Sequence, residues 1–256
     1  MNEFITTSLL PSQDVGVTLV ILGAFLFAGI VKGFLGIGLP PAAMVILTLV
    51  IDTPTAISLL TLPIIFTNLF QYLRCENRVD IAKKYWLIGL SLMVSIFFTS
   101  LFIMSFPKSI ISITIGFAMM LFSLSQMVGT KISFGAGSIW HLAVGLFAGL
   151  LGGLSSIWSP PVAMYLLARR VSKVEFIGAT GFLFLSGSVP LAIGLGFAGV
   201  LTKDTILHSL MGLIAVLVGF WIGEWLRYHV KQESFRRIVL WAFLIMGGRL
   251  VAMGLS

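Results

Sequence analysis

Charged side chains are scarce in this 256-residue sequence, where Asp, Glu, Lys and Arg make up 10% of all residues. Soluble globular domains carry about 25%. Hydrophobic residues make up 58%, and the mean hydropathy is +1.09, so the chain belongs with membrane proteins rather than soluble ones. The net charge of +7 comes from bases in short loops between apolar runs. That placement orients a protein in a membrane, and it argues against a nucleic-acid partner.

Groups that form disulfides or hold metals and cofactors are also scarce. Cys75 is the single cysteine, which excludes an internal disulfide, and no Cys/His cluster has metal-ligand spacing. No carboxylate lies deep in an apolar run, so no relay of buried acids for protons or sodium is visible. We therefore expect neither a metal nor a cofactor. The first 14 residues carry two acids and no base, which predicts a retained end rather than a cleaved signal peptide.

Apolar runs cover most of the chain, and most of them reach the about 20 residues that a helix needs to cross a bilayer. They lie at 15–38, 42–51, 54–73, 85–106, 109–129, 139–169, 176–201, 205–226 and 238–255. Two stretches, 15–51 and 139–169, are interrupted, at GIGLPP (36–41) and at GGLSSIWSPP (152–161). The sequence therefore predicts an all-α polytopic membrane protein with one interrupted helix in each half.

The two interrupted stretches are related to each other. Aligned without gaps at an offset of 120, residues 27–44 and 147–164 are identical at nine of eighteen positions, including a Pro-Pro pair behind spaced glycines. Such self-similarity indicates an internal repeat. We therefore divide the one integral membrane domain into a first repeat, 1–128, and a second repeat, 129–256.

The basic residues predict how these repeats lie in the membrane. If each interrupted stretch is a re-entrant hairpin followed by three spanning helices, the second repeat is inverted relative to the first. Twelve bases then collect on one face and three on the other, as the positive-inside rule requires. If each interrupted stretch crosses once instead, the bases split nearly evenly between the faces. We therefore expect an inverted repeat in a bacterial inner membrane, with both termini outside.

The interruptions are also the best candidates for a binding site. Proline is tolerated in the first turn of a helix, so the two Pro-Pro pairs predict short helices at 41–51 and 161–169. Helix starts attract anions, and paired breaks in the two halves of a transporter point to a site near the midplane. We expect both turns to contact a small oxyanion. The candidate residues are Gly36, Gly38, Pro40, Pro41, Ser155, Ser156, Trp158, Ser159, Pro160 and Pro161.

Other polar residues inside the apolar runs could join this site. Lys32 either supplies positive charge to the anion or extends along its stem to the membrane interface. Asn68, Gln71 and Ser188 follow the two interruptions, and each could bind substrate or join helices by hydrogen bonds. Small-xxx-small spacing favours close helix packing for two pairs of glycines: Gly29 with Gly33 and Gly149 with Gly153.

Two motifs, AGIVKGFLGIGLPP (28–41) and GLFAGLLGGLSSIWSPPVAMYLLARRVSK (145–173), resemble the paired signatures of the sulfite exporter TauE/SafE family. The runs GLIAVLVGFWIGEWL (212–226) and FRRIVLWAFLIMGGRLV (235–251) are similar to the closing helices of that family. Leu39 and Ser159 stand where the signatures commonly have glycine. The resemblance implies a multi-pass inner-membrane protein that moves sulfite or organosulfur anions.

Several functions are compatible with these features. The leading one is a secondary transporter that exports sulfite or a small organosulfur anion, and the alternative within transport is uptake of another small anion, or a channel for it. An intramembrane serine protease would need a histidine within hydrogen-bond reach of its serine, for which His208 is the candidate. A scaffold protein would leave the paired interruptions unexplained. We predict a protein that is not an enzyme, with a small anion and the lipid bilayer as partners; a homodimer is compatible with the sequence.

Overall fold

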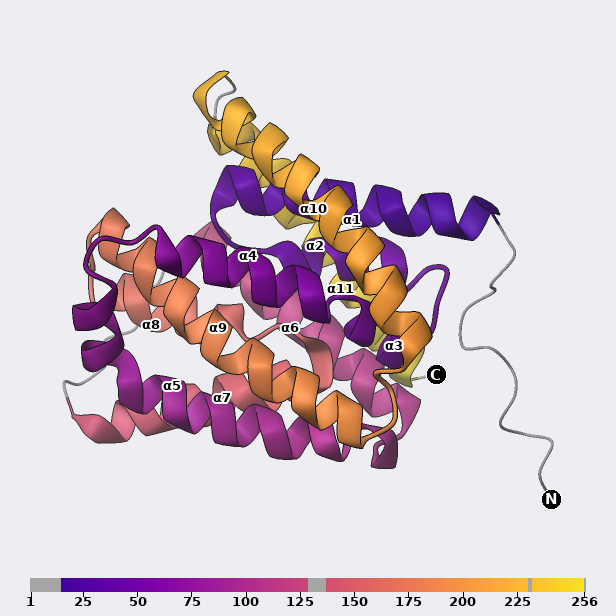
Figure 1. Cartoon of the computed structure of the whole chain (residues 1–256), viewed down its shortest axis with the longest axis horizontal. Coiled ribbons are helices and arrows are strands. Elements are labelled where there is room, and N and C mark those ends of the chain that lie inside the picture. The colour runs from indigo at the N-terminus through magenta and orange to yellow at the C-terminus, as the bar shows by residue number, and fades with distance from the viewer. Residues whose placement is uncertain (1–14, 129–136, 230–231, 256) are drawn as a thin grey trace.

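The computed structural model describes residues 15–128, 137–229 and 232–255. Within these ranges the chain is a bundle of helices without strands (Figure 1). The first repeat contains α1 (Val15–Leu35), α2 (Leu39–Leu47), α3 (Thr53–Leu59), α4 (Thr61–Leu73), α5 (Arg78–Leu101), η1 (Ile103–Ser105) and α6 (Lys108–Val128). The second contains α7 (Ser138–Ser155), α8 (Ser159–Ala168), α9 (Lys173–Phe197), α10 (Lys203–His229) and α11 (Gln232–Leu255).

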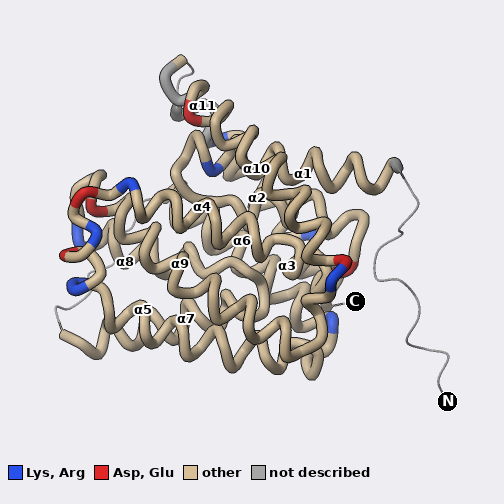
Figure 2. The backbone as a smooth tube through the Cα atoms, in the orientation of Figure 1, with Lys and Arg blue, Asp and Glu red and all other residues tan. Residues whose placement is uncertain are grey.

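Eight of the described helical segments are long and apolar enough to cross a membrane, with α3 and α4 counted together as one. Large apolar side chains such as Leu19, Trp86, Phe117 and Trp221 are exposed on the outer surface. Charged residues gather at the ends of the bundle and leave its middle nearly bare (Figure 2). The chain is therefore a multi-pass membrane protein, as its composition predicts.

Each interrupted stretch folds back on itself as a hairpin. α1 runs from one end of the bundle toward the other and α2 returns, while α7 and α8 do the same from the opposite end (Figure 1). The short helices begin earlier than predicted, at Leu39 and Ser159, so the prolines occupy their second and third positions. α2 also ends at Leu47, short of the predicted residue 51. Beyond Leu47 the backbone includes hydrogen bonds between residues three apart instead of four: the Leu49 N–H donates to the Ile46 carbonyl at 3.0 Å.

α1 and α10 pack closely because both present glycines at their contact. A Cβ atom at Gly33 would lie 2.2 Å from the Phe220 carbonyl oxygen, and one at Gly223 would lie 2.2 Å from the Ile30 carbonyl oxygen. Real Cβ atoms do not approach this near, so only glycine permits the spacing. Gly29 makes a similar approach at 2.3 Å. The packing role that the spacing predicts for Gly29 and Gly33 is confirmed.

α7 uses the same device against α5. A Cβ atom at Gly149 would lie 2.4 Å from the Ser95 side chain, and one at Gly153 would lie 2.6 Å from the Thr99 side chain. The predicted packing role of this second pair is confirmed as well. Small residues at matching positions thus bring each long hairpin arm against a helix of the other repeat.

α3 and α4 form one bent span because of Pro63. Proline has no N–H to donate, so the carbonyl of Leu59, four residues earlier, loses its helical partner. Ser209 of α10 replaces that partner: its hydroxyl donates to the Leu59 carbonyl at 2.8 Å and accepts from the Leu62 N–H at 3.2 Å. The bend is therefore stabilised from the second repeat.

The helices of the two repeats interlock. α1 packs on α10, and α7, its counterpart in the second repeat, packs on α5, the counterpart of α10. α4 packs on α9, and α6 packs on α11. If each helix is replaced by its counterpart in the other repeat, the same set of helix pairs results. The start of α1 and the end of α11 lie at the same end of the bundle (Figure 1); the inversion of the repeats within a membrane stays a prediction.

Candidate functional site

The tips of the two hairpins meet inside the bundle around a small cavity, called the central cavity below. About 10 Å³ of it is free, which is room for roughly one water molecule. The lining includes one basic residue and no acidic one. Its residues are Lys32, Ile37, Gly38, Leu39, Pro40, Ile64, Asn68, Ser156, Trp158, Ser159 and Phe184.

Lys32 is the basic residue of this cavity and is only 3% exposed. Its Nζ donates to the Thr67 hydroxyl oxygen at 3.1 Å and to the Asn68 side-chain oxygen. The side chain therefore stays inside the bundle rather than extending to the interface, and its role toward an anion stays a prediction. The ion pairs of the described residues lie elsewhere, between Arg74 and Glu224 and between Lys84 and Glu175. An ammonium at Lys32 thus has no counter-ion within the described part of the chain.

Three donors beside Lys32 lack a hydrogen-bond partner among the described residues. They are the hydroxyls of Ser156 and Ser159 and the indole N–H of Trp158, and all three residues are at most 5% exposed. A buried polar group left without a partner costs about 1–3 kcal/mol, and native proteins contain few of them. An indole N–H can donate but not accept. The set therefore suits a ligand that accepts hydrogen bonds, which favours an anion over a cation.

Both short helices start at the central cavity, and neither start is capped by a side chain. The prolines limit what the backbone can donate there, because Pro40, Pro41 and their counterparts have no N–H. Among the first three residues of each helix, only Leu39 and Ser159 carry one. The helix starts would therefore act on a bound anion mainly through their dipoles, and most of its hydrogen bonds would have to come from side chains.

The turns that precede these starts need special backbone conformations. Gly36 and Gly38 have φ values of 82° and 95°, in the left-handed region that glycine adopts readily. The second turn places Ser156 at a φ of 59°, which is costly for a residue with a side chain. Ser155 supports this turn: its hydroxyl donates to the Leu151 carbonyl and accepts from the Ile157 N–H.

The two repeats place their long side chains at different positions of the site. At the offset of 120, Lys32 matches Gly152, and Gly38 matches Trp158. A Cβ atom at Gly152 would lie 2.8 Å from the Trp158 ring, so the glycine makes room for the indole. Phe184 holds that ring edge-on, with the ring centroids 6.2 Å apart. The first repeat thus supplies the cation, and the second supplies the indole donor.

Half of the residues predicted for the site line the central cavity. They are Lys32, Gly38, Pro40, Asn68, Ser156, Trp158 and Ser159. Gly36 and Ser155 shape the turns, and Pro41 and Pro160 are buried within the helix starts.

Three predicted residues lie away from the cavity. Gln71 joins α4 to α9, since its Nε2 donates to the Ile177 carbonyl at 2.8 Å and to the Thr180 hydroxyl at 3.0 Å. The Ser188 hydroxyl donates to a carbonyl of its own helix. Pro161 lines a separate apolar cavity.

The sequence did not point to the apolar wall of the cavity. Ile64 and Phe184 could not be identified from the sequence, because in a hydrophobic chain an apolar residue that lines a cavity cannot be distinguished from one that faces lipid or another helix. Ile37 did carry a signal, since it is identical to Ile157 in the repeat alignment. Thr67 lies beside Asn68 on the same helix and could have been found as a partner for a buried lysine.

A larger cavity lies on the other side of Ile37. It measures about 260 Å³, and its lining includes Leu167 and Phe176, which flank the basic α8–α9 loop. The central cavity and this second one share Ile37. Ile37 therefore borders both the central cavity and a space near the end of the bundle that carries this loop.

The family model of the sulfite exporter TauE/SafE matches residues 21–250, nearly the whole chain. The chain belongs to the TauE/SafE family. This is a family of membrane transporters, in agreement with the eight candidate spans among the described residues of this TauE/SafE protein. No curated protein and no solved structure matches the chain significantly.

The histidines of this TauE/SafE protein lie away from the serines of the second turn. His141 pairs with the Tyr165 hydroxyl, and the rings of His208 and His229 pair with carbonyls of their own helices. His208 lies in the second turn of α10, where it pairs with the Asp204 carbonyl. No described histidine is positioned as a base for Ser155 or Ser156, which counts against the protease alternative.

Proposed function

We propose that this TauE/SafE protein is a secondary transporter that exports sulfite or a small organosulfur anion through the central cavity. One observation carries the proposal: among the described residues, a buried lysine and three buried donors without a partner face one cavity that no carboxylate lines. A sulfur oxyanion would supply the missing counter-charge to Lys32. Its oxygens would accept from Ser156, Trp158 and Ser159, and both helix dipoles would favour its negative charge.

The anion needs a route to the bundle ends, because the central cavity has room for only about one water molecule. Ile37 lines both the central cavity and the cavity of about 260 Å³. We propose that the anion passes Ile37 on its way between the central cavity and the basic end. The positive-inside rule assigns that end to the cytoplasm, which would leave the start of α1 and the end of α11 outside.

The decisive experiment is efflux from proteoliposomes loaded with sulfite, followed at a fixed membrane potential. We expect saturable efflux that other small organosulfur anions inhibit. A flux that rises linearly with concentration would favour the channel alternative. The exporter assignment would fail if folded protein gave no saturable flux with any sulfur oxyanion.

Replacing Ile37 with alanine tests the proposed route. The smaller side chain removes the partition between the two cavities, so we expect sulfite efflux to rise several-fold and its selectivity among anions to fall. Ile157→Ala is the matched control, because Ile157 holds the equivalent position in the repeat, is buried and lines neither cavity. Equal effects of the two substitutions on efflux, at equal yields of folded protein, would contradict the route past Ile37.

A further inference from the structure

A second polar cavity lies at the basic end of the bundle, where α5, α7, α8 and α9 meet. It measures about 270 Å³, and its lining residues are Lys84, Tyr85, His141, Tyr165, Arg169 and Val171. It shares none of these residues with the central cavity. α8 connects the two: Ser159 at its start lines the central cavity, and Arg169, ten residues later, lines this one, about 15 Å further along at 1.5 Å per residue.

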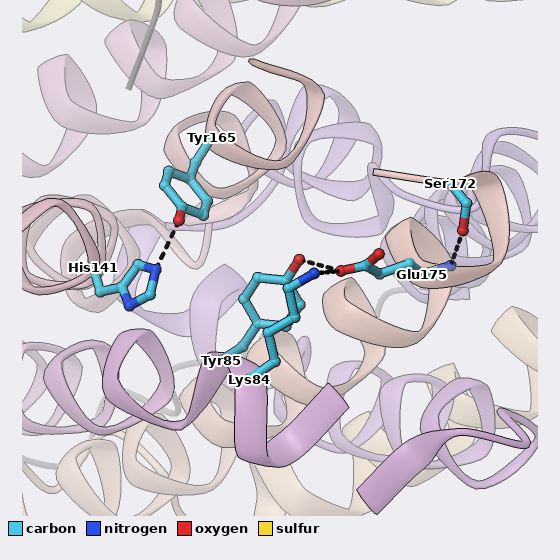
Figure 3. Close-up of polar contacts among 6 residues, drawn as sticks. All are labelled: Lys84, Tyr85, His141, Tyr165, Ser172 and Glu175. Carbon is cyan, nitrogen blue, oxygen red and sulfur yellow. Dashed lines mark hydrogen bonds and ion pairs between the residues drawn. The ribbon is translucent and has the colours of Figure 1, made fainter. Parts of the chain in front are cut away.

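Hydrogen bonds hold the polar side chains of this cavity in place. Nε2 of His141 lies 2.7 Å from the Tyr165 hydroxyl, which joins the two arms of the second hairpin (Figure 3). On the facing helices, Nζ of Lys84 and the Tyr85 hydroxyl both donate to Oε1 of Glu175, at 2.5 and 2.6 Å. Glu175 lines the adjoining cavity rather than this one. Its carboxylate neutralises Lys84 and leaves the other cation of the cavity unbalanced.

That other cation is Arg169. It is exposed to solvent and makes no ion pair or hydrogen bond through its side chain among the described residues. A guanidinium presents several N–H donors in a planar fork, which matches two oxygens of one oxyanion. Arg169 lines this cavity together with Tyr85, His141 and Tyr165. The cavity therefore combines a free fork of donors with hydroxyl and imidazole groups.

The first repeat shows that the hairpin does not need these side chains in order to fold. At the offset of 120, His141 corresponds to Ile21, Tyr165 to Val45, and Arg169 to Leu49. The first hairpin thus forms with apolar residues at all three positions. The fold of the hairpin therefore does not require the polar set, which occurs only in the hairpin that starts and ends at the basic face.

We propose that this cavity is a second oxyanion-binding site, in which Arg169 binds the anion through paired N–H groups. Lys84, His141 and the two phenols surround it. The site holds small sulfur oxyanions at the basic end of the bundle, one α8 length from the central cavity. The identity of the anion rests on the proposed transport function, whereas the existence of the site rests on the geometry at Arg169.

Counting bound anions tests the proposal. Equilibrium dialysis of radiolabelled sulfite against the detergent-purified protein, under argon, should give two bound anions per wild-type chain. Arg169→Gln should lose one of them, and Lys32→Gln should lose the other. Arg169→Lys keeps the charge but not the fork, so its weakened binding would report on geometry even if Arg169→Gln were poorly folded.

Arg170→Gln is the matched control, because Arg170 adjoins Arg169, carries the same charge and does not line the cavity. It should keep both anions. The proposal is overturned if Arg169→Gln binds as many anions as the wild type, or if Arg170→Gln loses as many as Arg169→Gln. Loss of one anion in Arg169→Gln together with no loss in Lys32→Gln would support this site and contradict the central one.

Discussion

Replacing Lys32 with methionine should nearly abolish sulfite efflux while the protein stays folded. Methionine fills a similar volume without charge, so the substitution removes a buried ammonium that has no counter-ion among the described residues. A hydrogen bond to a charged group contributes about 1.5–3 kcal/mol, which corresponds to roughly tenfold to hundredfold in affinity. We expect a loss of at least this size in efflux from proteoliposomes, with little change in the melting temperature, because removing the buried charge offsets the lost hydrogen bond to Asn68.

Lys203→Met is the control for this experiment, because Lys203 is an exposed lysine at the start of α10 and does not line the central cavity. It should leave efflux at the wild-type level. Wild-type efflux from Lys32→Met would show that the anion does not use the central cavity. A lowered melting temperature without a specific loss of efflux would instead assign Lys32 a structural role with Thr67 and Asn68.

The sequence predicts those parts of the fold that depend on local backbone chemistry. Gly36 and Gly38 have positive φ, and the Pro-Pro pairs stand inside the first turns of α2 and α8, so the interruptions were visible as patterns. The glycine pair of α1 was visible because its spacing alone brings both residues to one helix face. Each of these features is determined by residues that lie close together in the sequence.

Which residues belong to the site depends on contacts between segments that are distant in the chain, and the sequence alone does not reveal these contacts. Gln71 and Asn68 lie three residues apart on α4, yet Asn68 meets Lys32 whereas Gln71 meets the α9 backbone. The direction of the Lys32 side chain depends on the position of α4. The place of Trp158 depends on the empty space at Gly152, a residue that has no polar chemistry of its own.

The repeats share a backbone plan, but they divide the chemistry between them. Lys32 comes from an arm of the first hairpin, whereas Ser156, Trp158 and Ser159 come from the turn and short helix of the second. In the proposed site, a symmetric pair of lysines would place two like charges beside one small anion. Gly152 at the position matching Lys32 avoids this repulsion and gives the volume to an indole that donates without charge.

Alanine substitutions at two glycines of α1 should change stability in opposite directions. A Cβ atom at Gly33 would lie 2.2 Å from the Phe220 carbonyl oxygen, and because backbone cannot yield locally, α1 and α10 must separate. Overpacking of this kind typically costs about 1–3 kcal/mol. Gly23 has no atom within 4 Å of its Cβ position, so Gly23→Ala should gain from the better helix propensity of alanine, by up to about 1 kcal/mol. Thermal unfolding in detergent, followed by size-exclusion chromatography, measures both changes.

This pair of variants also tests how the site depends on packing. Gly33 adjoins Lys32, so a separation of α1 from α10 would move the ammonium relative to Asn68 and to the second hairpin. We therefore expect Gly33→Ala to lower both the melting temperature and the efflux per folded molecule, whereas Lys32→Met lowers efflux alone. If Gly33→Ala and Gly23→Ala melt at the same temperature, the close approach of α1 and α10 is not what positions Lys32.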